Sequence, residues 1–150
     1  MNELHANTSL HNSRYAIQKT LGQGGFGITY LAYDNVNRRQ VAIKEFFMKE
    51  LCNRKGKTHH MSVPSTGSRK LVDKFRAKFL KEANTIANLS HPNIIKIYDI
   101  FEENDTAYYA MEYISGGSLA DLLEKEPEKR FCEVDALHYI LQVAGALNYI

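Results

Sequence analysis

The chain has few cysteines and no long apolar run, and these absences narrow its class. Its two cysteines, Cys52 and Cys132, do not make a disulfide framework, and neither stands in a C-x-x-C motif of the kind that binds zinc. No run approaches the roughly 18 apolar residues that a membrane-spanning helix needs. Residues 1–13 are polar and lack the apolar core of a signal peptide. We therefore expect a cytoplasmic protein without a membrane segment.

The composition is that of a folded domain with an uneven distribution of charge. Of the 150 residues, 44% are hydrophobic and 24% charged, which is typical of soluble globular proteins. Residues 54–81 contain nine Lys or Arg and one acid, whereas residues 99–135 contain eleven Asp or Glu and three Lys or Arg. Each segment is either a solvated face or, in the basic case, a site for an anion such as a phosphorylated segment. Because no basic groove with interleaved aromatics is visible, nucleic acid is not expected as a partner.

A glycine-rich motif lies near the start of the chain. Gly22, Gly24 and Gly27 form a G-x-G-x-x-G, whose glycines let backbone N–H groups approach a phosphate. In a dinucleotide-binding βαβ unit, a helix opens at such glycines. Here residues 26–33 are β-branched and aromatic and predict a strand, and after a turn residues 39–47 predict another. The glycines therefore lie at a hairpin tip, which disfavours the dinucleotide interpretation.

A lysine and a glutamate lie at positions where burying their charge would cost free energy unless an opposite charge pairs with it. The period of a strand places Ala42 and Lys44 on the face opposite Val41 and Ile43. Residues 69–89 have helical periodicity, and Glu82 falls within their apolar stripe of Phe75, Phe79, Ile86 and Leu89. Such a carboxylate either meets a cation or sits at the edge of the stripe in water.

Three motifs together resemble the opening of a protein kinase domain: the glycine triplet, Val41-Ala42-Ile43-Lys44 and the later His91-Pro92-Asn93. The segment from Gly24 to Tyr30 resembles eukaryotic-like serine/threonine kinases of bacteria. The resemblance extends from about Tyr15 to Ile150. It implies an α+β fold, in which a five-stranded antiparallel sheet and one helix (αC) form an N-lobe that is followed by a hinge and the first C-lobe helices.

The resemblance also implies domain boundaries. Residues 14–114 would form the N-lobe, with an irregular insertion at residues 48–70 between the third strand and helix αC. Residues 115–150 would be the hinge exit and the start of the C-lobe. Residues 1–13 are expected to be a flexible leader.

By the same resemblance, Lys44 would hold the α- and β-phosphates of ATP and pair with Glu82, and these two are the expected catalytic residues. Leu21 and Ala42 would enclose the adenine, Met111 would stand behind it, and the Glu112 carbonyl and Ile114 N–H would bind its edge. The full expected nucleotide set is Leu21, Gly22, Gln23, Gly24, Gly25, Phe26, Gly27, Thr29, Ala42, Lys44, Met111, Glu112, Ile114 and Ser118.

Some positions depart from the family pattern. Ser118 stands where many members place a ribose-binding acid, and Thr29 replaces a usual valine. Lys78, one turn before Glu82, would face a phosphate on the activation segment.

The function that this resemblance implies is transfer of the ATP γ-phosphate to Ser or Thr hydroxyls of a protein substrate. The His-Arg-Asp and Asp-Phe-Gly motifs, which supply the base and the Mg²⁺ ligands, do not occur in these 150 residues. We therefore expect no metal site here and no catalysis by this chain alone. The alternative is a pseudokinase, a regulatory module that binds nucleotide or partners. An apolar stripe in residues 132–150, if uncovered, would favour self-association.

Overall fold

The computed structural model describes residues 2–55 and 58–150. Contacts divide the chain into two compact units. The first contains the residues up to Asn88 together with Lys96–Tyr113, and the second contains Leu89–Ile95 and Ile114–Ile150.

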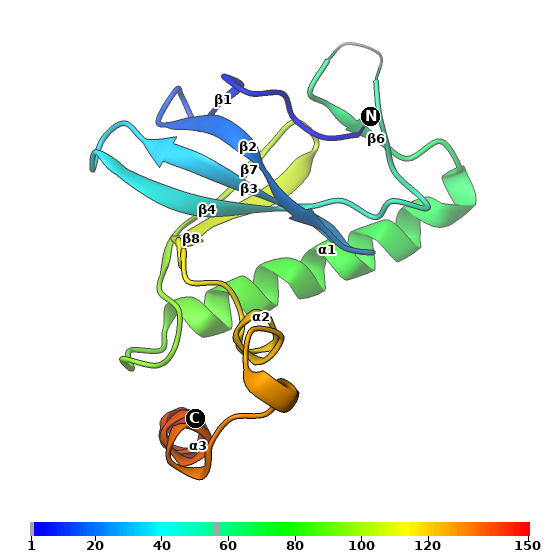
Figure 1. Ribbon diagram of the computed structural model, residues 1–150. Coiled ribbons are helices and arrows are strands. Elements are labelled where there is room, and N and C mark those ends of the chain that lie inside the picture. The colour runs from blue at the N-terminus through cyan, green and yellow to red at the C-terminus, as the bar shows by residue number, and fades with distance from the viewer. Residues whose placement is uncertain (1, 56–57) are drawn as a thin grey trace. The chain divides into compact units, whose positions relative to one another are not determined.

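The first unit is built on an antiparallel sheet of six strands in the order β1-β2-β3-β4-β8-β7 (Figure 1). The strands are β1 (Ser9–Leu10), β2 (Tyr15–Gln23), β3 (Gly27–Asp34), β4 (Arg39–Phe46), β7 (Ile97–Glu103) and β8 (Thr106–Glu112). In β2 only Tyr15 and Ile17 are buried, whereas β3 and β4 have buried runs that follow from their Val, Ile, Tyr and Ala content. The five expected strands are confirmed, and β1 adds a sixth.

The leader is part of this sheet. Leu10 of β1 pairs with Tyr15 of β2, and two hydrogen bonds join Asn7 N–H to Ile17 O (2.8 Å) and Ile17 N–H to Thr8 O (2.9 Å). Leu4 and Leu10 are buried in the core. The segment that was expected to be a flexible leader thus pairs with β2 in this structure and contributes two leucines to the core.

One face of the sheet is covered by α1 (Thr66–Ala87), which confirms the predicted helix (Figure 1). Phe79 packs between Phe46 and Tyr109, with ring centroids 5.7 and 5.0 Å away. Val72 and Ala83 are buried beside it. Of the predicted stripe, only Phe79 is buried, since α1 turns the line of Val72, Phe79 and Ala83 toward the strands.

The insertion contributes to the core of the same unit. It contains an antiparallel pair, β5 (Asn53–Arg54) and β6 (Met61–Ser62), where the sequence predicted irregular chain. Cys52 and Met61 are buried in the core cluster, and Met61 N–H donates to Asn104 O (2.8 Å) in the β7–β8 turn. Residues 56–57 of the predicted insertion lie outside the described residues.

The second unit is helical. It contains α2 (Leu119–Leu123), a short 3₁₀ turn (Pro127–Lys129) and α3 (Glu133–Tyr149). The loop Leu89–Ile95 is held against α3, because Ser90 N–H donates to Tyr149 Oη (3.1 Å) and Asn93 Nδ2 to Gln142 Oε1 (2.9 Å).

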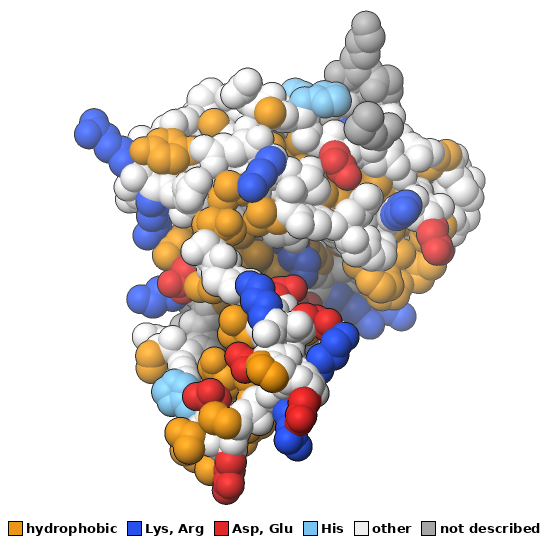
Figure 2. All heavy atoms as spheres, viewed as in Figure 1, with side chains coloured by type: hydrophobic (Ala, Val, Ile, Leu, Met, Phe, Trp, Pro, Cys, Tyr) orange, Lys and Arg blue, Asp and Glu red, His pale blue; other side chains and the backbone are white. Residues whose placement is uncertain are grey.

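Hydrophobic side chains are exposed along α3 (Figure 2), among them Val134, Leu137, Ile140, Leu141 and Leu147. No helix in the described part of the chain combines the length and hydrophobicity needed to cross a bilayer.

A buried carboxylate, that of Asp34, stabilises the C-terminal end of β3. Asp34, at the end of β3, has a fully buried side chain that accepts hydrogen bonds from Arg14 Nε and Nη2 (3.3 and 3.2 Å), from Asn37 Nδ2 (2.8 Å), and from the backbone N–H groups of Val36 and Asn37. Burial by itself would raise the pKa of Asp34, but these hydrogen bonds outweigh it and lower the pKa to about 2.

Replacing this carboxylate tests the fold. We expect Asp34→Asn to lower the free energy of unfolding by about 2 kcal/mol at neutral pH. The lowered pKa means that the carboxylate stabilises the fold above the unfolded-state pKa, and that this stabilisation declines as the pH falls. The difference between wild type and variant should therefore shrink from about pH 5 to about pH 2 in urea denaturation. The exposed carboxylate variant Asp105→Asn serves as control, and an equal, pH-independent difference in both variants would contradict the assignment.

Candidate nucleotide-binding site

The glycine motif forms the tip of the β2–β3 hairpin, as its sequence context predicted. Gly22 pairs with Thr29 and Gln23 with Ile28, and Gly24 N–H donates to Gly27 O (2.9 Å) to close the turn. The register shifts between Thr20 and Gly22, so that Leu21 lies in an irregular step of β2 with 41% of its surface exposed.

Strand β4 presents the predicted lysine on the face that α1 covers. Lys44 pairs with Thr29 of β3 on one side and with Tyr109 of β8 on the other. Ala42 pairs with Met111 two residues earlier on the same face. The sheet thus brings these positions, which are distant in sequence, onto one surface.

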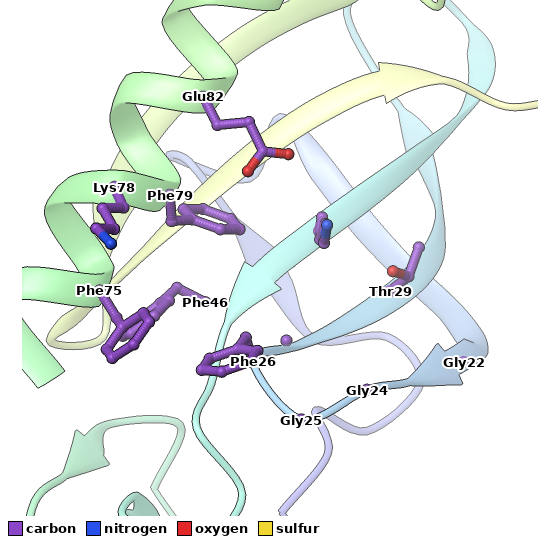
Figure 3. Close-up of a pocket in the computed structure, with 12 residues that line it drawn as sticks. Gly22, Gly24, Gly25, Phe26, Thr29, Phe46, Phe75, Lys78, Phe79 and Glu82 are labelled. Atoms are coloured by element: carbon purple, nitrogen blue, oxygen red, sulfur yellow. The ribbon is translucent and has the colours of Figure 1, made fainter.

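A pocket of about 470 Å³ lies between the glycine turn, β4 and α1 (Figure 3). Its lining includes Gly22, Gly24, Gly25, Phe26, Gly27, Thr29, Lys44, Phe46, Phe75, Lys78, Phe79 and Glu82. Of the predicted site, it gathers the glycines, Phe26, Thr29, Lys44 and Glu82. Leu21, Gln23, Ala42, Met111 and Glu112 belong to the same unit but do not line it.

Lys44 and Glu82 line this pocket without forming an ion pair within the described chain. The Lys44 ammonium lies 5.8 Å from the centre of the Tyr109 ring. Figure 3 shows the Glu82 side chain extending from α1 toward the strands. The predicted contact between the two residues therefore stays a prediction.

Aromatic residues join the glycine turn to α1, and sequence reasoning did not assign this role. Phe26 stacks on Phe75 with ring centroids 5.1 Å apart (Figure 3). The Lys78 ammonium lies 5.4 Å from the centre of the Phe75 ring, inside the pocket. The helical periodicity of Phe75 was visible in the sequence, but its partner on the glycine turn is a non-local contact.

The remaining predicted residues, Ile114 and Ser118, lie in the second unit. Gly117 has a φ of +79°, a conformation that favours glycine, and it leads into the N-terminus of α2. Ser118 forms a capping box there, since its hydroxyl oxygen accepts from Asp121 N–H (3.2 Å) and its N–H donates to Asp121 Oδ2 (2.7 Å). The Ser118 hydroxyl also donates to Asp121 Oδ2 (2.7 Å). These bonds, first that from the Ser118 backbone, lower the pKa of Asp121. The structure thus gives Ser118 a helix-capping role.

Within residues 2–55 and 58–150, no group of three His, Cys, Asp or Glu side chains is placed to hold a metal ion. The described residues therefore offer no three-ligand site for a Mg²⁺ ion.

A second ionisable cluster lies behind Lys44, on the opposite face of β4. The fully buried carboxylate of Glu45 accepts hydrogen bonds from Tyr30 Oη (2.7 Å), Tyr108 Oη (2.8 Å) and Arg54 Nη2 (2.5 Å). Burial first, and then the Glu45 charge, raise the pKa of both tyrosines well above the usual value, so both remain donors.

Comparison with known proteins identifies the family. The protein kinase domain family matches residues 15–150. The chain is 36% identical over 111 residues to the serine/threonine-protein kinase PknD of Protochlamydia amoebophila, covering 74% of this chain and 9% of that protein. It is 32% identical over 126 residues to PksC of Streptomyces coelicolor, covering 81% of this chain and 19% of that protein. The chain belongs to the protein kinase family and is related to its serine/threonine kinases.

Solved structures agree with this fold. The apo form of PpkA-294 superposes with a TM-score of 0.78 at 32% identity, over 86% of this chain and 45% of that one. The Mycobacterium tuberculosis PknI kinase domain superposes with a TM-score of 0.70 at 22% identity, over 98% of this chain and 50% of that one. The chain therefore spans about half of these kinase structures and a small part of the whole relatives.

Two glycines of the motif differ in the space around them, which gives a direct test. A Cβ added at Gly27 would lie 2.7 Å from the Glu45 carbonyl oxygen, whereas nothing lies within 4 Å of one added at Gly22. We expect Gly27→Ala to lower the free energy of unfolding by about 1–3 kcal/mol, because backbone must shift to admit the methyl group. Gly22→Ala should change it by less than about 0.5 kcal/mol. Urea denaturation of both variants measures this, and equal effects would refute the close approach at Gly27.

Proposed function

We propose that the protein is a serine/threonine kinase that transfers the γ-phosphate of ATP to hydroxyl groups of a protein substrate, and that this chain supplies the part that binds the nucleotide. The observation that carries the proposal is the joint placement of the glycine turn, Lys44 and Glu82 around one pocket. Family membership supports the same reaction.

The chemistry of the pocket fits a polyphosphate. Its lining contains two cations, Lys44 and Lys78, and one carboxylate, Glu82, so its formal charge is positive. Gly22 and Gly25 leave open space where side chains would otherwise stand. A positively charged, partly apolar pocket beside an unobstructed backbone favours an anionic ligand with an apolar end.

Within the reaction, the residues of this chain bind and orient. Lys44 holds the phosphates that stay with ADP, and Glu82 holds the lysine in place. The bond from the γ-phosphorus to its bridging oxygen breaks as the substrate hydroxyl bonds to that phosphorus. We propose that the acceptor of the hydroxyl proton and the Mg²⁺ ligands come from outside these 150 residues, so that the chain alone is inactive.

Replacing Lys44 tests the proposal in the full-length protein. We expect Lys44→Met to reduce autophosphorylation by at least about 100-fold, because the α- and β-phosphates lose their cation. The matched control is Lys74→Met, which removes an exposed lysine of α1 that does not line the pocket. Incorporation of phosphate from labelled ATP, with phosphoamino-acid analysis, measures both activity and specificity for Ser and Thr.

Autophosphorylation that survives Lys44→Met would contradict the kinase assignment. Binding of ATP by the wild type without any phosphate transfer would favour the pseudokinase alternative. Phosphotyrosine as the sole product would overturn the Ser/Thr assignment.

A further inference from the structure

The Glu45 cluster joins four other segments of the chain to β4. Besides Glu45, the Arg54 guanidinium binds two backbone oxygens, Asn2 O through Nε (2.7 Å) and His59 O through Nη1 (2.6 Å). Tyr30 Oη accepts from Leu4 N–H (3.1 Å) and donates to Glu45. The leader, the insertion and strands β3 and β8 therefore meet at one carboxylate.

The charges in this cluster depend on one another. The Arg54 side chain is 6% exposed and the Glu45 side chain is fully buried. Burial alone would lower the pKa of Arg54, but the Glu45 charge and hydrogen bond raise it overall. Without Arg54, the Glu45 carboxylate would keep only the two tyrosine hydroxyls as donors, and its buried charge would be poorly compensated. Because Glu45 is fully buried and belongs to β4, a shift of its side chain to a better-solvated position would disturb the end of β4.

The same end of β4 carries the nucleotide pocket. Lys44 is the neighbour of Glu45 in the chain, and its side chain is on the opposite face. The Glu45 carbonyl lies so close to Gly27 that no Cβ would fit between them. One and two residues further on, Thr106 Oγ1 donates to Phe46 O (2.6 Å) and Phe47 N–H donates to Phe26 O (3.1 Å). A displacement of Glu45 would therefore be transmitted both to the lysine and to the glycine turn.

From this geometry we propose that Arg54 is a positioning residue for the nucleotide site, which holds Lys44 and the glycine turn in place by anchoring Glu45 from the far side of the sheet. The proposal rests on the proposed ATP-binding function. In this proposal the role of the insertion is to place the Arg54 side chain in the core, beside Glu45.

The test compares two arginines in the full-length protein. Arg54→Met removes the cation of Glu45, and Arg14→Met removes the cation of Asp34, another fully buried carboxylate of the same sheet. Asp34 is the last residue of β3, at the opposite end of the strand from Gly27 and the glycine turn. We expect both variants to lose stability, but only Arg54→Met to weaken binding of a fluorescent ATP analogue, by roughly tenfold. Arg14→Met should bind within about twofold of wild type.

A measurement without nucleotide distinguishes a local effect on the glycine turn and the end of β4 from a general loss of stability. Hydrogen exchange at the amides of residues 26–28 and 44–47 should accelerate in Arg54→Met and not in Arg14→Met. The double variant Arg54→Met with Glu45→Gln should recover part of the affinity, because the uncompensated charge is gone. Equal affinity and exchange in the two arginine variants would overturn the proposal.

Two further comparisons keep the outcome decisive. If Arg54→Met does not unfold cooperatively, Arg54→Lys against Arg14→Lys carries the same test, since lysine keeps the charge but cannot bridge Glu45 to both backbone oxygens. Wild-type protein that binds no ATP analogue would refute the proposed function itself. Wild type that binds, with Arg54 variants that bind equally well, would refute only the positioning role.

Discussion

The structure of the first unit depends on a carboxylate that has no access to water. Glu45 is fully buried, and it is stabilised there by Arg54 and by the hydroxyl groups of Tyr30 and Tyr108. Breaking such a buried pair by removing one partner costs about 3–5 kcal/mol in proteins. That is a large share of the 5–15 kcal/mol by which a typical domain is stable. The cluster therefore constrains where the insertion and the leader lie, because Arg54 binds Asn2 O and His59 O as well.

Strand β4 separates two kinds of chemistry by the alternation of its side chains. Val41, Ile43 and Glu45 face the side that the leader and insertion cover, and Ala42 and Lys44 face the side of α1. The first side is apolar except for the buried ion pair between Glu45 and Arg54. The second opens into a pocket whose lysines are in no ion pair among the described residues. One strand thus provides both a rigid support and an available cation.

The sequence predicted the local part of this arrangement. The glycine spacing and the β-branched residues after it placed the hairpin tip, and the period of two placed Lys44 on its face. The sequence analysis did not single out Glu45, although the same period of two places it on the face of Val41 and Ile43. Its partner Arg54 was not predictable, since it reaches β4 from a two-residue strand inside a polar insertion. The contacts of residues 2–13 were not predictable for a related reason, because they join residues distant in sequence, as Leu4 and Tyr30 are.

The contrast between the two faces also explains why the pocket is a better candidate for a ligand site than the Glu45 cluster. At Glu45 each carboxylate oxygen has a donor, so a ligand would have to break hydrogen bonds that are already made. In the pocket the ammonium of Lys44 rests near an aromatic ring, and Lys78 adds a second positive charge. An anion there gains charge-assisted hydrogen bonds without displacing an existing ion pair. A phosphate group bound at Lys44 would also attract the backbone N–H groups of the glycine turn. Because Phe26 of this turn stacks on Phe75, a movement of the turn toward the phosphate would also affect α1.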